Sequence, residues 1–248
     1  MNVLLRLVSL TVLMVAWYVG SQFADPRTFP GPDTVVLAMW AEAQTGALLY
    51  NLAVTLLRVA VSFAIAMALG SVLGLWMGRA RLADDLIDPW LVALLNLPAL
   101  VIIVLAYVWG GLSETAGIVA VVLNKLPNAT VTVREGARAL DRQLDEMAEV
   151  FRMDGWVRVR HVIIPQLAPY LAAATRSGLS LVWKIVLIVE LLGRPDGVGF
   201  EIGTAFQLFD VTRILAYAIA FILVMLAIET FVVQPLERRV SRWRPKPS

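Results

Sequence analysis

Two long apolar runs without a charged residue limit what this chain can fold into. Residues 59–78 contain no Asp, Glu, Lys or Arg, and neither do residues 89–111. A helix needs about 20 predominantly apolar residues to cross the hydrocarbon of a bilayer, so each run is long enough to do so. The chain is therefore expected to be an all-α, polytopic membrane protein.

The composition supports this class and excludes several others. Apolar residues make up 59% of the chain, against roughly 45–50% in a typical soluble domain. Mean hydropathy is +0.77. Charged residues make up only 16%, which excludes a disordered or nucleic-acid-binding chain, and the net charge of +2 does not imply a polyanionic partner. The absence of Cys excludes disulfides, thiolate metal sites and a Cys nucleophile.

The hydropathy pattern predicts about six transmembrane helices in one domain, residues 1–248. The predicted spans are residues 3–20, 52–78, 89–111, 115–133, 167–192 and 214–235. Pro98 is expected to kink the third span, and the glycines and alanines of the second allow close helix packing. The first span could instead be a signal peptide, but no clean small-x-small cleavage site follows it. Residues 21–50 are predicted to form a polar connector with a short interfacial helix, and residues 193–213 a polar loop.

The basic residues divide unequally between the two sides of the predicted membrane. Most of the 21 lysine and arginine residues fall on one side, at Arg6, Arg79, Arg81, Arg134, Arg138, Arg142, Arg152, Arg158 and Arg160 and in the tail 238–246. The other side holds Arg27, Arg194 and Arg213, with Arg58 at its border. Cytoplasmic loops carry the excess of positive charge, so both termini and residues 135–165 are predicted to be cytoplasmic.

The segment 135–165 is charged and amphipathic, between two apolar runs. Leu140, Leu144, Met147, Val150 and Phe151 follow helical spacing. Gly155 is predicted to break this helix, and Pro165 with Pro169 to mark the start of the next span. One interpretation is a helix that docks on a soluble partner. The alternative is an amphipathic helix lying on the lipid headgroups.

Residues in this segment carry a family resemblance. Glu146, Met147 and Ala148, followed by Val162, Ile164 and Pro165, resemble the Glu-Ala-Ala … Ile-x-Leu-Pro loop of ABC importer permeases. Met147 replaces an Ala of that pattern. Arg152 stands where the family usually has Gly, a residue that tolerates unusual backbone angles, and Gly155 follows three residues later.

The resemblance extends from Leu52 to the C-terminus and is closest to the nitrate/sulfonate/taurine branch. It includes the Thr-Leu-Leu-Arg-Val run at Thr55, the Glu-Leu-Leu-Gly run at Glu190, the Gly-Val-Gly-Phe run at Gly197 and the Arg-Arg-x-x-x-Arg-Trp tail at Arg238. It implies a type I ABC importer permease fold in the bacterial cytoplasmic (inner) membrane, with a cytoplasmic coupling helix. It also implies three partners: two copies of an ATP-binding cassette ATPase, a periplasmic or lipid-anchored solute-binding protein, and a second copy of this chain in a homodimer.

The resemblance assigns the contact with the ATPase to the segment 135–165. Glu146 could pair with a basic residue of the ATPase, while large apolar side chains fill its groove, which is the usual anatomy of an interface hot spot. The residues expected to couple to the ATPase are Glu146, Met147, Ala148, Phe151, Arg152, Gly155, Trp156 and Pro165.

Polar residues inside the spans are candidates for the translocation path: Asn124, Lys125, Asn128, Arg176, Lys184 and Glu190. Ionisable groups at mid-membrane cost about 3 kcal/mol on insertion scales, so they seldom face lipid. Each could instead be structural: Arg176 could extend its charge to the membrane surface, Lys184 could pair with a carboxylate in a span, and the asparagines could join two helices. Three basic residues in the spans against two carboxylates, Glu190 and Glu229, favour a small anion as solute.

No feature indicates catalysis or a resident cofactor. A Gly-Lys-Ser/Thr phosphate-binding motif is absent, so ATP hydrolysis is assigned to a separate subunit. His161 is the only histidine, which leaves a metal site or a catalytic base without partners. The main alternative function is an autonomous ion-coupled secondary transporter with Glu190, Glu229 and Lys184 as its relay. A membrane-embedded enzyme is a third interpretation.

Overall fold

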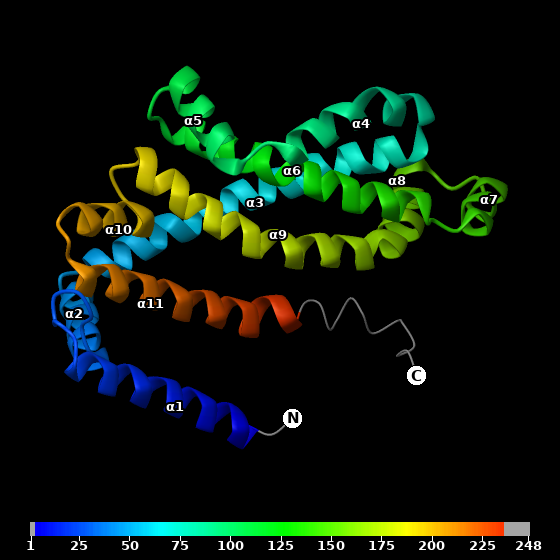
Figure 1. The fold of residues 1–248 in the computed structure, drawn as a ribbon. Coiled ribbons are helices and arrows are strands. Elements are labelled where there is room, and N and C mark those ends of the chain that lie inside the picture. The colour runs from blue at the N-terminus through cyan, green and yellow to red at the C-terminus, as the bar shows by residue number, and fades with distance from the viewer. Residues whose placement is uncertain (1–2, 236–248) are drawn as a thin grey trace. The chain divides into compact units, whose positions relative to one another are not determined.

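The computed structural model describes residues 3–235, and these are entirely helical and connecting segments. The predicted Arg-rich tail at 238–246 lies outside the described residues, as does the side chain of Arg6. The helices are α1 (Val3–Gln22), α2 (Pro32–Gln44), α3 (Ala47–Arg79), α4 (Arg81–Asn96), α5 (Ala99–Gly110), α6 (Glu114–Arg138), α7 (Arg142–Val150), α8 (Gly155–Arg158), α9 (Ile164–Gly193), α10 (Val198–Gln207) and α11 (Val211–Ile228). Two π-helical turns, η1 (Val159–Ile163) and η2 (Glu229–Val233), complete the set (Figure 1). The all-α prediction is confirmed.

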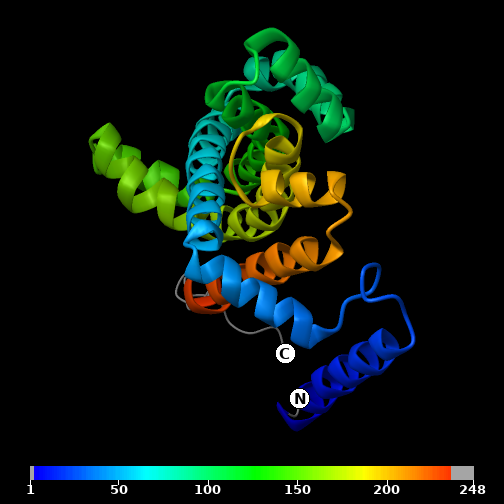
Figure 2. The same cartoon turned by 90° about the vertical axis from the view of Figure 1, so that its left-hand side faces the viewer.

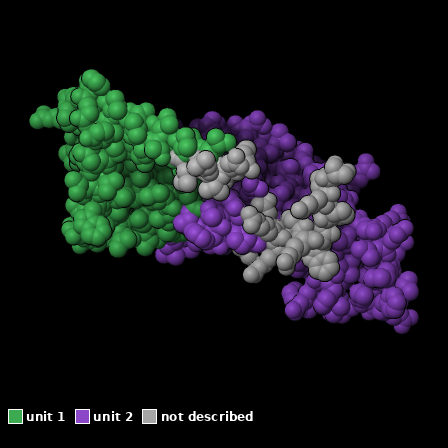
Figure 3. Space-filling view, turned by 90° about the horizontal axis from the view of Figure 1, so that it is seen from below, with its two compact units in different colours: residues 1–56, 190–226 green, residues 57–189, 227–248 purple. Residues whose placement is uncertain are grey.

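The chain forms two compact units. Unit 1 contains residues 1–56 and 190–226, and unit 2 contains residues 57–189 and 227–248 (Figure 3). All three boundaries fall inside helices, because α3, α9 and α11 each contribute residues to both units.

Four helical segments of the described residues are long and apolar enough to cross a membrane. They are Ala47–Arg79, Glu114–Arg138, Gly155–Gly193 and Val211–Val233. The pair α4 and α5 would make a fifth span if counted together, and the apolar part of α1, Val8–Gln22, is shorter. The structure therefore supports four or five spans, and the predicted count of six is not confirmed.

Close approach of α3 and α6 builds the centre of unit 2 (Figure 1 and Figure 2). Gly70, Gly74 and Gly78 are spaced four apart, so they share one face of α3. A Cβ atom on Gly70 would lie 2.7 Å from the Ala129 Cβ atom, and one on Gly74 would lie 2.5 Å from the Thr130 carbonyl oxygen. Only glycine permits this separation, as expected for small residues that let membrane helices pack closely.

The core of unit 2 lies beside this contact. Its buried side chains come from α3, α5, α6 and α9, and include Ile103, Ala120, Val182 and Val186 at 0% exposure. Arg58 is buried at its edge and donates two hydrogen bonds to the Glu114 carboxylate, at 2.7 and 2.9 Å.

The third predicted span is broken rather than kinked. α4 ends at Asn96, α5 begins at Ala99, and their axes are bent by 100°. Pro98 is the residue before α5, where its missing N–H and fixed φ angle suit a helix start. The position of the disturbance was thus predicted correctly, but its size was underestimated.

Several segment boundaries also differ from the predictions. Residues 193–213 are largely helical, because α10 occupies Val198–Gln207. The span predicted to end at residue 133 continues as α6 to Arg138. Pro165 and Pro169 do lie at the start of the fifth span as predicted, since Pro165 is the second residue of α9 and Pro169 follows inside the helix.

Candidate functional site

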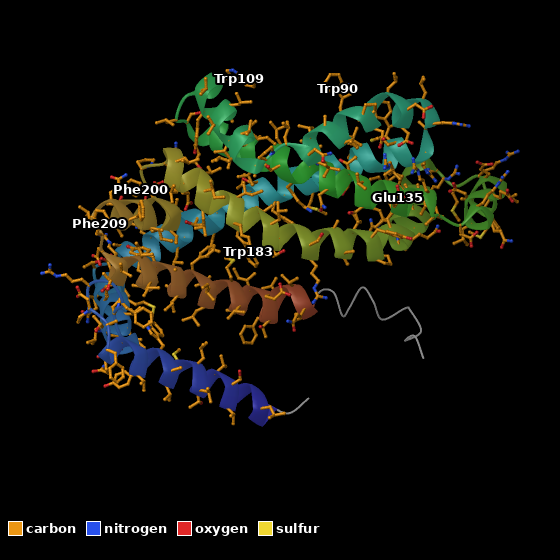
Figure 4. All side chains as sticks on the ribbon, in the orientation of Figure 1. Trp90, Trp109, Glu135, Trp183, Phe200 and Phe209 are labelled. Carbon is orange, nitrogen blue, oxygen red and sulfur yellow. The ribbon has the colours of Figure 1, made fainter. Side chains whose placement is uncertain are left out.

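Helix α7 and the turn after it lie at one end of unit 2, in the segment predicted to be cytoplasmic (Figure 1). Asp141 caps its first turn, since its carboxylate accepts a hydrogen bond of 2.8 Å from the Gln143 backbone N–H. The Asp141 backbone N–H in turn donates to the Gln166 side chain on α9, also at 2.8 Å. α7 is therefore fixed to α9 at the point where it begins. Figure 4 labels Glu135 at the end of α6 that leads into this segment.

The other end of α7 is closed by Arg152. The Arg152 N–H donates to the Glu149 carbonyl at 2.9 Å, and the Met153 N–H donates to the Ala148 carbonyl at 2.9 Å. This pair of bonds is the Schellman arrangement, which places the residue at Arg152 in the left-handed region. Arg152 has a φ of 49°. The helix thus ends before Arg152, and the prediction that Gly155 breaks it is wrong: Gly155 begins α8.

Large apolar side chains on and after α7 are exposed. The exposed fractions are 80% for Val150, 72% for Phe151 and 65% for Trp156, with Leu144 and Met147 at 38% and 37%. Ala148 is the one buried residue of α7, at 1%. We call Leu144, Met147, Val150, Phe151 and Trp156 the apolar patch. Contiguous exposed apolar side chains of this kind are typical of surfaces that bind a protein or a membrane.

Ion pairs connect α7 to the ends of the long helices. The Asp145 carboxylate accepts from Arg79, the last residue of α3, at 2.7 Å, and from Arg158 of α8 at 3.2 Å. Arg158 also reaches Glu149 at 3.3 Å. Asp145 therefore joins α7 to both α3 and the segment that leads into α9.

The remaining predicted coupling residues have simpler surroundings. Glu146 is exposed and pairs with Arg142 on α7 itself, at 3.0 Å. A Cβ atom on Gly155 would meet no atom within 4 Å. Pro165 is the second residue of α9 and is exposed.

A second polar cluster, in unit 1, holds the start of α10. Three successive backbone N–H groups at this helix end each donate to a side chain. Gly197 donates to the Asn51 side-chain oxygen at 2.7 Å, Val198 to the Thr55 hydroxyl at 2.9 Å, and Gly199 to the Glu190 carboxylate at 2.9 Å. The Thr55 hydroxyl also donates to Glu190 at 2.9 Å.

Glu190 is thereby enclosed. Its side chain is fully buried, and its carboxylate lies at the positive end of α10, where a negative charge is stabilised. Gly197 has a φ of 104°, and a Cβ atom there would overlap the Glu190 carboxylate. This geometry explains the Glu-Leu-Leu-Gly and Gly-Val-Gly runs as one structural unit that positions α10.

Lys125 is enclosed in unit 2. It is fully buried, and its ammonium donates to the Asn128 side-chain oxygen at 2.7 Å and to the Ala174 carbonyl at 3.2 Å. Gly178 of α9 leaves room for the lysine, since a Cβ atom there would overlap its side chain. Asn124 bonds its own helix, at the Ala120 carbonyl. The structure thus brings together Lys125 and Asn128 of the six path candidates.

Arg176 and Lys184 differ from Lys125 because their side chains are exposed along α9. They do not join the Lys125 cluster. The six candidates therefore comprise two buried residues in separate clusters, Lys125 and Glu190, an exposed pair, Arg176 and Lys184, and the half-buried Asn124 and Asn128.

Sequence reasoning missed the residues that fix these clusters in place: Asn51, Arg79, Asp145 and Arg158. Asp145 and Arg79 are charged residues near a predicted membrane surface, where many charges are solvated, so their types and spacing gave no signal. Thr55 was noted only as part of a resembling run.

Comparisons with known proteins identify a family model and relatives that this chain resembles. Residues 66–242 match the family described as "Binding-protein-dependent transport system inner membrane component". The chain is 30% identical over 235 residues to the aliphatic sulfonates transport permease protein SsuC of Escherichia coli (strain K12), covering 94% of this chain and 89% of that protein. It is 28% identical to SsuC of Bacillus subtilis (strain 168), covering 94% of this chain and 85% of that protein.

A solved structure has the same fold. A chain of the MetNI methionine ABC transporter, in an inward-facing conformation, superposes with a TM-score of 0.62 at 17% identity. The match covers 82% of this chain and 97% of that chain. The expected type I importer permease fold is confirmed by this likeness.

Proposed function

We propose, from the premise that the chain belongs to the family of binding-protein-dependent transport system inner membrane components, that it is the membrane-spanning permease subunit of an ATP-driven importer. As a member of that family it is a multi-pass protein of the inner membrane. Its task is to pass a small solute from a solute-binding protein to the cytoplasm. The chemistry of ATP hydrolysis belongs to a separate ATPase subunit.

The exposed apolar patch on α7 carries this proposal. Phe151 and Trp156 are large aromatic side chains at 72% and 65% exposure. Aromatic anchors surrounded by charged groups are typical of interface hot spots. Arg142, Glu146 and Glu149 supply the charged surroundings, since all three are exposed on the same short helix. We assign the patch to a groove on the ATPase rather than to lipid headgroups.

The connections of α7 suggest how movement of the ATPase reaches the spans. Asp145 is bonded to Arg79 and Arg158, and Asp141 to Gln166, so a displacement of α7 acts on α3, α8 and α9 together. In the proposed cycle, ATP closes the ATPase pair, the two docking helices move together, and the path opens outward to accept the solute. Hydrolysis returns the path to its inward-open state.

The proposed assembly contains two copies of this chain, two ATPase subunits and one solute-binding protein. The termini and residues 135–165 are assigned to the cytoplasm, because that side carries most of the basic residues. The solute is proposed to be a small anion such as a sulfonate, a carboxylate or nitrate. The names of the SsuC relatives, which refer to aliphatic sulfonates, support this class.

The test is reconstitution. The chain is co-expressed with its ATPase and binding-protein partners, purified as a complex and placed in proteoliposomes. We expect the ATPase to co-elute and uptake to require both ATP and the binding protein. Uptake by the isolated chain, driven by a proton gradient, would instead support a secondary transporter.

A further inference from the structure

Helix α9 has a polar, positively charged face on the outside of unit 2. Arg176, Ser180 and Lys184 are spaced four residues apart, so they lie in a row along one face of the helix. Ser177 lies beside them. All four residues are exposed, whereas the opposite face, including Ala174, Gly178, Val182 and Val186, is buried. We call Arg176, Ser177, Ser180 and Lys184 the α9 polar face.

This row lies deep within a membrane-spanning helix. At 1.5 Å per residue, Arg176 is about 18 Å from the first residue of α9, and Lys184 is about 14 Å from its last. Charged side chains at this depth are unfavourable in lipid and usually face a water-filled cavity or the interior of a bundle. The α9 polar face therefore does not suit contact with lipid.

Two other charged groups of the spans, Lys125 and Glu190, are not part of this face. Lys125 and Glu190 are fully buried in the hydrogen-bonded clusters described above. The serine hydroxyls bond carbonyls of their own helix, Ser177 at Ala174 and Ser180 at Ser177, and can rotate toward a guest. The α9 polar face thus presents two cations, about 12 Å apart along the helix, and two hydroxyls.

We propose that the α9 polar face is the part of the import path that binds the anionic group of the solute, with Arg176 and Lys184 as successive positive contacts. A cation in a low-dielectric path attracts an anion much more strongly than it does in water. Two contacts in a row let the anion pass from one to the next. This inference rests on the proposed function, because it assigns a ligand to the import path.

The test uses the absence of native Cys. Ser180→Cys is placed in the full-length chain and assembled with its partners in right-side-out and inside-out membrane vesicles. Two methanethiosulfonate reagents are compared, one bearing a sulfonate and one a trimethylammonium group, each normalised to its rate with a free thiol. Ala174→Cys serves as the control, since Ala174 is fully buried on the opposite face.

We expect Ser180→Cys to react from at least one side, about tenfold faster with the anionic reagent, and Ala174→Cys to stay unmodified. Adding Lys184→Met should remove most of this preference, and Lys184→Arg should keep it. No reaction at Ser180→Cys in either vesicle type would overturn the inference, and so would equal rates or a preference for the cationic reagent. Labelling needs neither ATP hydrolysis nor a known solute, so a failed uptake assay would count against the proposed function alone.

Discussion

Asp145 of α7 bonds Arg79, the last residue of α3, at 2.7 Å, although the two residues are 66 positions apart in the sequence. Asp145 also bonds Arg158. One carboxylate therefore connects the proposed docking helix to the end of α3 and to α8, which leads into α9. Both partners of the Asp145–Arg79 pair are about one-third exposed, so the pair contributes little to stability. The position of the pair, between α7 and the end of α3, suits the transmission of a movement of α7 to α3.

Asp145→Asn is expected to reduce ATP-driven uptake while leaving the complex assembled. The substitution removes the charge that both arginines share, and changes along a coupling route typically alter it by about 0.5–2 kcal/mol. The expected loss in transport per ATP hydrolysed is about 2- to 30-fold. Uptake and ATPase activity are measured together in proteoliposomes. Asp85→Asn is the matched control, because Asp85 is an exposed residue of α4.

Removing the aromatic groups of the apolar patch should weaken binding of the ATPase. Truncation of a hot-spot aromatic typically costs about 2 kcal/mol or more, so Phe151→Ala with Trp156→Ala should reduce affinity by more than about tenfold. Co-elution from detergent and binding-protein-stimulated ATPase activity measure this. Phe206→Ala removes an equally exposed aromatic side chain from α10 and should change neither. Normal coupling in the double variant would exclude the patch as the docking surface.

Replacing Arg152 with Gly should stabilise the turn after α7. Arg152 has a φ of 49°, which costs a residue with a side chain about 1 kcal/mol or more and costs glycine little. Arg152→Gly is expected to raise the melting temperature in detergent by about 2–4 °C. The greater conformational entropy that glycine gives the unfolded chain reduces this gain. Arg152→Ala keeps the Cβ atom and should give no increase. A rise of equal size in both variants would show that the guanidinium, and not the backbone, is unfavourable.

Gly197→Ala is expected to destabilise unit 1 strongly. Its φ of 104° is disfavoured for any side chain, and the added Cβ atom would displace the buried Glu190 carboxylate. The combined cost should exceed about 3 kcal/mol, seen as a lower melting temperature and reduced yield. Gly155→Ala is the same substitution at a position with no atom within 4 Å and should be neutral. Equal effects at the two positions would contradict the enclosed geometry of Glu190.

The predicted orientation can be measured with single cysteines. An impermeant thiol reagent applied to intact cells should modify Phe206→Cys on α10 and leave Gln143→Cys on α7 unmodified. Both side chains are exposed, so access from the protein side is comparable. Inside-out vesicles serve as the control and should reverse the result. Modification of Gln143→Cys in intact cells would place the docking helix on the wrong side for a cytoplasmic ATPase.

The sequence alone determined the class of the protein and most of its helices. Long apolar runs predicted α3, α9 and α11, because a segment that crosses lipid must be predominantly apolar whatever its neighbours are. Helical spacing located α7, since its pattern repeats within a few residues. The charge asymmetry gave a predicted orientation, and the spacing from Glu146 to Pro165 gave the family resemblance.

The tertiary structure decided which polar residues are enclosed and which are exposed. Lys125 and Lys184 look alike in sequence, both being lysines inside a span, but Gly178 and Asn128 enclose only the first. Glu190 is held in a structural cluster by a hydrogen bond from Thr55, which is 135 positions away in the sequence. Long-range contacts of this kind leave no periodic trace in the sequence. The sequence shows that a charged residue inside a span must avoid lipid. Only the packing of the helices shows whether its side chain contacts other protein groups or lines an open path.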